Sequence, residues 1–270
     1  MLAFLAQGKE DISWQALIHK VPRGVLAWAA RAGTNSLATP DNLARWGVKV
    51  DQKCRIQDCT SVCTLGHLLN HCQKSLDRYR WRHDSCLTYL VRRIVTCKAA
   101  TMSVYADLEG WKINGGTVPG DLVAIGQVPD IVLLDRSQKK IVLLELTYPF
   151  DSSASSFKSA FDRKTERYER LALDLEELGF TVLNMPFEIG SRGVVTARNH
   201  MVLATVASMY GIRNMLVLRR SLGKISLMAS HRIYLARASS DWTSGDFFKP
   251  KPFSLTTKVM VKSSDPGDIQ

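Results

Sequence analysis

The sequence predicts an α+β or α/β fold, in which a helical N-terminal region with a cysteine–histidine cluster precedes a mixed β-sheet flanked by helices. Three observations support this prediction. Four cysteines and two histidines fall between residues 54 and 72. Two apolar runs of strand length follow at residues 130–134 and 141–147, and apolar residues then recur at helical spacing between residues 155 and 178.

Composition and charge limit the classes of protein to consider. With 270 residues, 46% of them hydrophobic, the chain can form a substantial core, which excludes disorder as its dominant state. No apolar run approaches the roughly 18 to 20 residues of a membrane helix, and we expect neither a membrane location nor secretion. The net charge of +11 favours a polyanionic partner, with nucleic acid ahead of an anionic membrane surface.

The N-terminal part of the chain is predicted to be mostly helical. Capping residues, turns and glycines delimit three short helices at residues 13–20, 26–32 and 39–46. A longer basic helix is expected over residues 76–97, directly after the cysteine cluster. Residues 105–108 are predicted to be helix or loop.

The cysteine–histidine cluster has the spacing of a structural zinc site. Zinc prefers four sulfur or nitrogen ligands in a tetrahedron, and short loops bring such ligands together at little entropic cost. Cys54, Cys59, His67 and Cys72 fit this requirement, with His67 and Cys72 spaced to share one helical turn. Cys63 and His71 can substitute for them, so the spacing leaves open which four residues bind. The alternative is a set of buried free cysteines beside two surface histidines.

The two apolar runs predict a β-hairpin that carries a pair of carboxylates. If the hairpin is centred between Ser137 and Gln138, Asp130 lies opposite Glu145, with Cβ atoms about 5 Å apart. Two carboxylates at that distance repel each other unless a cation lies between them or one is protonated. A hard divalent cation such as Mg²⁺, bound between the two carboxylates, would offset this repulsion. The alternative is two ordinary strand-end carboxylates that face solvent, and a turn of odd length would shift the register.

The helix predicted over residues 155–178 contributes a lysine to the same place. Its apolar seam steps by four and three residues, and Lys164 is the one member that is neither apolar nor aromatic. We therefore expect Lys164 to point at the sheet, where a metal-bound carboxylate pair and an ammonium can activate water for attack on phosphate. A strand at residues 181–185 ended by Pro186, a helix at 194–210 and a short strand at 215–218 complete the predicted order.

Together these residues resemble the PD-(D/E)XK nucleases, most closely the restriction-like endonuclease at the C-terminus of site-specific non-LTR retrotransposon proteins. Asp130 and the sequence Glu145-x-Thr147 match the carboxylate positions, with Thr147 where most of these nucleases carry lysine. In the retrotransposon family a lysine on the following helix replaces it, and Lys164 occupies that position here. The Cys-x4-Cys-x7-His-x4-Cys spacing is similar to the family's CCHC zinc knuckle, with a wider first gap. Arg82-His83-Asp84 resembles its Arg-His motif between knuckle and nuclease.

The resemblance implies a metal-dependent DNA endonuclease that nicks target DNA and leaves a 3′-hydroxyl to prime reverse transcription. Asp130 and Glu145 would bind Mg²⁺ or Mn²⁺, and Lys164 would orient the attacking water or stabilise the transition state. Tyr168 would position phosphate, with packing in the core as an equal alternative. The knuckle ligands, Cys54, Cys59, His67 and Cys72, would hold a structural Zn²⁺. The residues expected to contact nucleic acid are Arg80, Arg82, His83 and Arg167. For His83 a satisfied interface histidine is an equal alternative, and for Arg167 a solvated helix face is the favoured one.

The resemblance also divides the chain. It implies a helical linker region (1–50), the knuckle with its basic helix (51–100), the endonuclease domain (101–240) and a C-terminal extension with a partly disordered tail (241–270). The implied partners are target DNA, element RNA and a reverse transcriptase acting in trans, and the implied location is the nucleus, otherwise the cytoplasm. The family's reverse transcriptase and N-terminal DNA-binding fingers have no counterpart in this sequence. There are therefore two competing hypotheses. In one, the chain is a catalytically inactive, zinc-containing module that binds nucleic acid; in the other, zinc only stabilises the domain.

Overall fold

A computed structural model describes residues 20–97, 102–123, 127–196, 198–211, 215–239 and 242. The helix predicted over residues 13–20 falls outside these ranges except for its last residue, as does the C-terminal extension except for Trp242. No helix in the described ranges is both long and apolar enough to cross a membrane.

The centre of the molecule is a four-stranded mixed sheet, which confirms the predicted α/β class. Its strands are β1 (Met102–Ala106), β2 (Ile131–Asp135), β3 (Lys140–Thr147) and β4 (Thr181–Glu188), in the order β1-β2-β3-β4. The first two pairings are antiparallel and the third is parallel. The hairpin register is the predicted one, because Ile131 pairs with Leu144 and Asp135 with Lys140.

Three predictions of secondary structure are wrong. Residues 105 and 106, expected in a helix or loop, belong to the edge strand β1, which has only five residues and little alternation. Pro186 lies inside β4 rather than ending it, since β4 is also an edge strand, where a residue without an N–H is tolerated. Residues 215–218 begin the helix α9 (Met215–Leu235). A four-residue apolar run cannot distinguish a strand from a buried helix.

The long helix expected over residues 155–178 is two helices, α6 (Ala154–Arg167) and α7 (Glu169–Glu177). They separate at Tyr168, whose backbone N–H bonds to the carbonyl of Thr165, three residues back. Asn184 of β4 also donates to that carbonyl, over 2.9 Å. The carbonyl of Thr165 is thus bonded by a side chain from another element. The sequence of the helix itself does not predict this contact.

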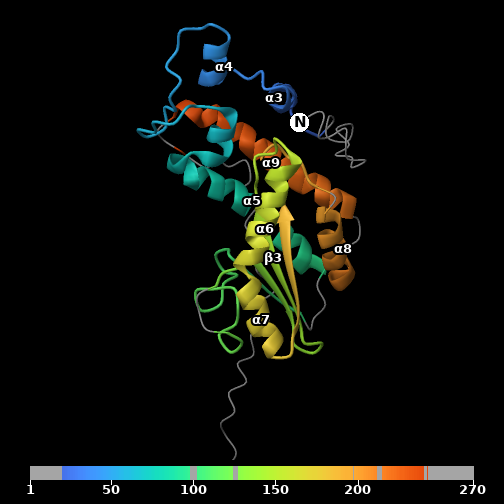
Figure 1. The fold of residues 1–270 in the computed structure, drawn as a ribbon. Coiled ribbons are helices and arrows are strands. Elements are labelled where there is room, and N and C mark those ends of the chain that lie inside the picture. Colours follow the sequence, from blue (N-terminus) through green and yellow to red (C-terminus); the bar gives the residue numbers. More distant parts are fainter. Residues whose placement is uncertain are drawn as a thin grey trace, which may run out of the picture.

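Helices cover both faces of the sheet (Figure 1). On one face, strand residues such as Leu133 and Val142 pack with α5 (Leu76–Cys97), α8 (Arg198–Tyr210) and α9. On the other face, Val132 and Leu143 pack with Tyr168, Leu171 and other residues of the α6–α7 layer. The helix predicted over residues 194–210 therefore exists but begins at Arg198.

A second hydrophobic core lies beyond the sheet, around the cysteine cluster. It joins α3 (Arg23–Gly33) to the cluster and to Leu227, Ile233 and Tyr234 in the C-terminal half of α9. The remaining short elements here are α4 (Pro40–Arg45), η1 (His67–His71), η2 (Gln73–Ser75) and η3 (Ala236–Ala238). Helix α9 therefore contributes to both cores. The predicted domain limits at residues 50, 100 and 240 stay predictions.

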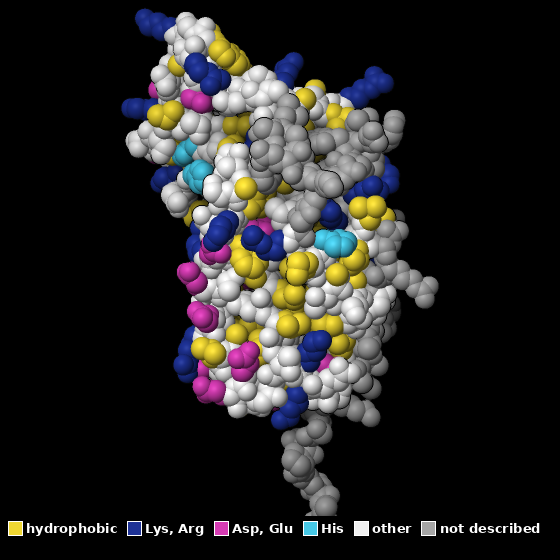
Figure 2. All heavy atoms as spheres, turned by 45° about the vertical axis from the view of Figure 1, so that its right-hand side comes forward, with side chains coloured by type: hydrophobic (Ala, Val, Ile, Leu, Met, Phe, Trp, Pro, Cys, Tyr) yellow, Lys and Arg dark blue, Asp and Glu magenta, His cyan; other side chains and the backbone are white. Residues whose placement is uncertain are grey.

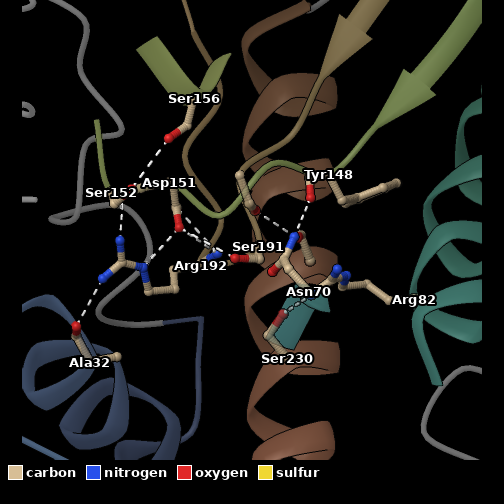
Figure 3. Close-up of polar contacts among 12 residues, drawn as sticks. Ala32, Asn70, Arg82, Tyr148, Asp151, Ser152, Ser156, Ser191, Arg192 and Ser230 are labelled. Carbon is tan, nitrogen blue, oxygen red and sulfur yellow. Dashed lines mark hydrogen bonds and ion pairs between the residues drawn. The ribbon is translucent and has the colours of Figure 1, made fainter. Parts of the chain in front are cut away.

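Buried polar contacts connect the two cores (Figure 3). The Arg192 side chain forms an ion pair with Asp151 at 2.8 Å and donates to the carbonyl of Ala32, at the end of α3, at 2.9 Å. Asn70 donates to the carbonyl of Tyr148, just after β3. These contacts join segments that lie far apart in the sequence, so the cysteine cluster is held against the end of the sheet.

Candidate functional site

Asp130 and Glu145 lie together at the end of the hairpin opposite its turn. Asp130 precedes β2 and Glu145 is near the end of β3, and the backbone N–H of Asp130 donates to Glu145 Oε2 over 3.0 Å. Asp130 Oδ2 accepts from the N–H of Leu146 at 2.6 Å. Burial and the charge of Asp130 raise the pKa of Glu145 against the opposing effect of Lys164. Two negative groups therefore crowd a site that is 6% exposed at Asp130 and 2% at Glu145.

Lys164 points at these carboxylates, as its place in the helix seam predicts. Its ammonium forms an ion pair with Glu145 Oε1. Tyr168, one turn further on, is buried, and its hydroxyl donates to the carbonyl of Val128 at 3.1 Å. Burial and the nearby Glu145 raise the Tyr168 pKa. Tyr168 thus packs in the core and does not line the cleft described below, while its predicted role toward phosphate stays a prediction.

His83, one of the predicted DNA contacts, lies against Asp130 and also lines the cleft described below, while its role toward DNA stays a prediction. Its Nε2 is 3.0 Å from Asp130 Oδ2, and its Nδ1 is 3.0 Å from Asp84 Oδ1. Burial opposes a charged ring, but the bonds to Asp130 and Asp84 raise the pKa of His83 to about 10. The sequence gives no sign of this contact, because 47 residues separate His83 from Asp130.

A cleft of about 740 Å³ lies beside the carboxylates: it is lined by His83 and Lys164, which contact Asp130 and Glu145, but not by the two carboxylates themselves. Its walls include His83, Lys164 and Thr147 together with the exposed side chains of Arg80 and Arg163. Neither arginine forms an ion pair with a described residue. The acidic residues of its lining are Asp84, Asp107 and Glu109. Arg163 was not among the predicted nucleic-acid contacts, and only its position beside Lys164 in the sequence could have suggested it.

Of the other predicted DNA contacts, Arg80 alone is both exposed and in the cleft. Arg82 is 2% exposed, and its guanidinium donates to Ser230 at 2.9 Å and lies over the Tyr148 ring (Figure 3). Arg82 is nevertheless among the residues that line the cleft, so its predicted contact with DNA stays a prediction. Arg167 is exposed, but it stacks on Tyr168 and does not line the cleft.

Surface charge is unevenly distributed on the face drawn in Figure 2. Lys and Arg side chains occur in both halves of the face, whereas most of the Asp and Glu side chains lie along one edge of its lower half, with a few elsewhere. In the sequence, residues 161–177 of α6 and α7 contain six acidic and four basic residues. The excess of positive charge therefore belongs to other parts of the chain.

The cysteine cluster forms a second candidate site. The ligand atoms of Cys54, Cys59, His67 and Cys72 all lie within 4.8 Å of one another. In a tetrahedral site with Zn–S bonds of about 2.3 Å, neighbouring sulfurs are about 3.8 Å apart. Burial raises the pKa of the Cys54 thiol to about 12, with a further contribution from the other thiols. Burial lowers the pKa of His67, which favours the neutral imidazole that binds metal. This group can hold a zinc ion.

Local geometry explains how the wide first gap still brings the ligands together. Gln57 and Asp58, between Cys54 and Cys59, both have left-handed backbones, with φ of 40° and 57°, which turn the chain back on itself. Residues five apart on an α-helix point about 140° away from each other. His67 and Cys72 instead flank a wider turn, closed by a 3.0 Å bond from the Cys72 N–H to the His67 carbonyl. Both side chains can therefore bind the same metal ion.

The structure favours four of the six candidate zinc ligands. Cys63 is buried close by, and burial raises its pKa to about 11, but it lies outside the four-residue group. His71 is exposed and also outside it. Cys54, Cys59, His67 and Cys72 are thus the set that the geometry favours.

No protein-family model matches the chain, and no curated protein matches it either.

Proposed function

We propose that this protein is a divalent-cation-dependent DNA endonuclease of the PD-(D/E)XK type, derived from a non-LTR retrotransposon. One observation carries the proposal: Asp130, Glu145 and Lys164, from three segments of the chain, converge beside a cleft whose Arg80 and Arg163 form no ion pair with a described residue. On this proposal the enzyme hydrolyses a phosphodiester of target DNA and leaves a 3′-hydroxyl for reverse transcription.

The donor set fits a hard divalent cation. Asp130 and Glu145 offer carboxylate oxygens, the ligands that Mg²⁺ and Mn²⁺ prefer. Their crowding, seen in the raised pKa of Glu145, is what a cation between them would relieve. When bound, such a cation supplies charge neutralisation and a more acidic bound water. None of the described residues donates a hydrogen bond to Asp130 Oδ1, which is therefore available as a ligand.

The remaining residues of the cleft would bind and orient the substrate. Lys164, held by Glu145, brings a positive charge to the edge of the cleft, where it can orient water or stabilise charge on phosphate. Arg80 and Arg163 would bind the phosphates on either side of the scissile bond. A zinc ion on the cysteine cluster would be structural. The partners would be DNA, element RNA and a separate reverse transcriptase, and the location would be the nucleus.

A second candidate is a catalytically inactive, zinc-containing module that only binds nucleic acid. One observation favours it: Glu145 is already neutralised by Lys164, and Asp130 is already bonded to His83. This arrangement is electrostatically complete without a cation. Both candidates predict DNA binding that weakens with salt, because both use lysine and arginine contacts to phosphate.

Nicking of supercoiled plasmid in Mg²⁺ or Mn²⁺ separates the two candidates. The variants Asp130→Asn, Glu145→Gln and Lys164→Met should each reduce nicking by about a hundredfold or more, since each removes a group that acts on the reacting atoms. The matched control is Asp121→Asn, which removes an exposed carboxylate paired with Arg136, outside the cleft. It should nick like the wild type.

The binding module predicts a different pattern. Wild type and all four variants would then be equally inactive in nicking while retaining DNA binding. That result would reject the endonuclease.

A further inference from the structure

His83 is held on both sides by carboxylates. It lies in the second turn of α5, with Nδ1 and Nε2 each 3.0 Å from an oxygen, of Asp84 and of Asp130 respectively. The ring meets Tyr148 edge-on, with centroids 5.7 Å apart. An ionised carboxylate only accepts hydrogen bonds, so both ring nitrogens act as donors. The orientation of the imidazole is thereby fixed.

The bond from His83 leaves the two oxygens of Asp130 unequal. Oδ2 accepts from His83 and from the backbone N–H of Leu146, at 3.0 Å and 2.6 Å. Oδ1 accepts from none of the described residues. Two donors on one oxygen fix the carboxylate plane and direct the other oxygen away from them.

The helix that carries His83 is itself anchored on the side of the cysteine cluster. The hydroxyl of Tyr79 donates to the carbonyls of His67 and Leu68, each at 3.0 Å, and accepts from the N–H of Cys72. The buried Arg78 donates to the carbonyls of Ala236 and Ser239. A side chain on so well fixed a helix can hold another group in place at little entropic cost.

We propose that His83 is a positioning residue for Asp130: it holds Oδ2 so that Oδ1 is presented to a divalent cation, while Asp84 orients the imidazole. This inference rests on the proposed function. It differs from the DNA contact expected from the sequence, because both donors of the ring are already used within the protein. Outer partners of metal-binding carboxylates commonly change metal affinity by 10- to 100-fold.

Two nearly isosteric substitutions separate the two contacts of His83. A glutamine amide nitrogen reaches the position of Nε2, so His83→Gln keeps the donor to Asp130. An asparagine amide nitrogen reaches only the position of Nδ1, so His83→Asn keeps the donor to Asp84 and loses the one to Asp130. Mn²⁺ binding by the full chain, followed by electron paramagnetic resonance without DNA, measures the effect directly. Zinc content and thermal unfolding verify that each variant is folded.

The expected result is that His83→Asn weakens Mn²⁺ binding by about tenfold or more, whereas His83→Gln stays within about threefold of wild type. Asp84→Asn should weaken it less than His83→Asn. The Mn²⁺ concentration for half-maximal plasmid nicking should shift in the same order, with DNA affinity in buffer without added divalent cation unchanged. Equal Mn²⁺ binding by His83→Asn and wild type would overturn the positioning role alone, as would a loss confined to DNA affinity. A wild type that neither binds Mn²⁺ nor nicks would overturn the proposed function as well.

Discussion

At the scale of residues, Cys59 and Cys63 show how two cysteines four residues apart take different roles. The sulfur of Cys59 lies 3.4 Å from His67 Nε2, within the four-residue group. Cys63 is more deeply buried but outside that group. Burial alone therefore does not identify a ligand, and the spacing in the sequence left both candidates open.

We expect about one zinc per chain, retained in Cys63→Ser and lost in Cys59→Ser. Removal of one of four ligands weakens a structural zinc site, and its binding free energy is also folding free energy. Elemental mass spectrometry of the purified variants measures the zinc, with Cys86→Ser, in the sheet core, as a control. Zinc loss in Cys63→Ser with retention in Cys59→Ser would mean that the ligand set is wrong.

Also at this scale, short-range rules predicted from the sequence how the residues of the carboxylate site come together. Contacts between residues far apart in the sequence were not predicted. Asp130 and Glu145 meet because a hairpin register is local, and Lys164 joins them because a helix seam has a fixed period. His83 reaches Asp130 from a helix that precedes β1, and Arg82 is buried against Ser230 of α9. No local period encodes either contact.

At the scale of elements, hydrogen bonds of the Tyr79 side chain connect the helix α5 to the wide turn η1. The Tyr79 hydroxyl bonds to three backbone groups between His67 and Cys72, two of the proposed zinc ligands. Burial raises the pKa of this phenol, so it stays a donor.

Tyr79→Phe should lower the free energy of unfolding by about 1–2 kcal/mol and speed the release of zinc to a competing chelator. The reason is that backbone groups in the turn lose their partner. Urea unfolding and a colorimetric chelator assay measure the two effects. Tyr105→Phe is the matched control, because the Tyr105 hydroxyl on β1 has no hydrogen-bond partner among the described residues. Similar losses in both variants would argue against a special role for Tyr79.

At the scale of the whole molecule, a buried ion pair connects α3 to the sheet. Asp151 and Arg192 follow β3 and β4 respectively, and Arg192 also reaches the last turn of α3 (Figure 3). Both side chains are almost fully buried, at 0% and 6% exposure. The arginine lies over the Phe150 ring as well.

Arg192→Met should destabilise the protein by about 3–5 kcal/mol, because it leaves Asp151 buried without its partner. Amide hydrogen exchange should rise first in residues 23–33, with β2 and β3 still protected. The control Arg170→Met breaks an exposed pair with Asp174 and should cost about 0.5 kcal/mol or less. Unchanged exchange in α3 after Arg192→Met would show that this contact does not hold the helix.

The sequence by itself determined the α/β class, the hairpin with its register, the direction of Lys164 and the six candidate ligands of a zinc site. Each of these follows from periodicity or from loops of a few residues, which act over short distances along the chain. Only the tertiary structure decided that His83 meets Asp130, that Arg82 is buried, and that Cys59 rather than Cys63 completes the ligand group. It also placed Pro186 on an edge strand and broke the long helix at Tyr168. These outcomes depend on contacts between elements, which the packing of the whole chain sets and no local pattern records.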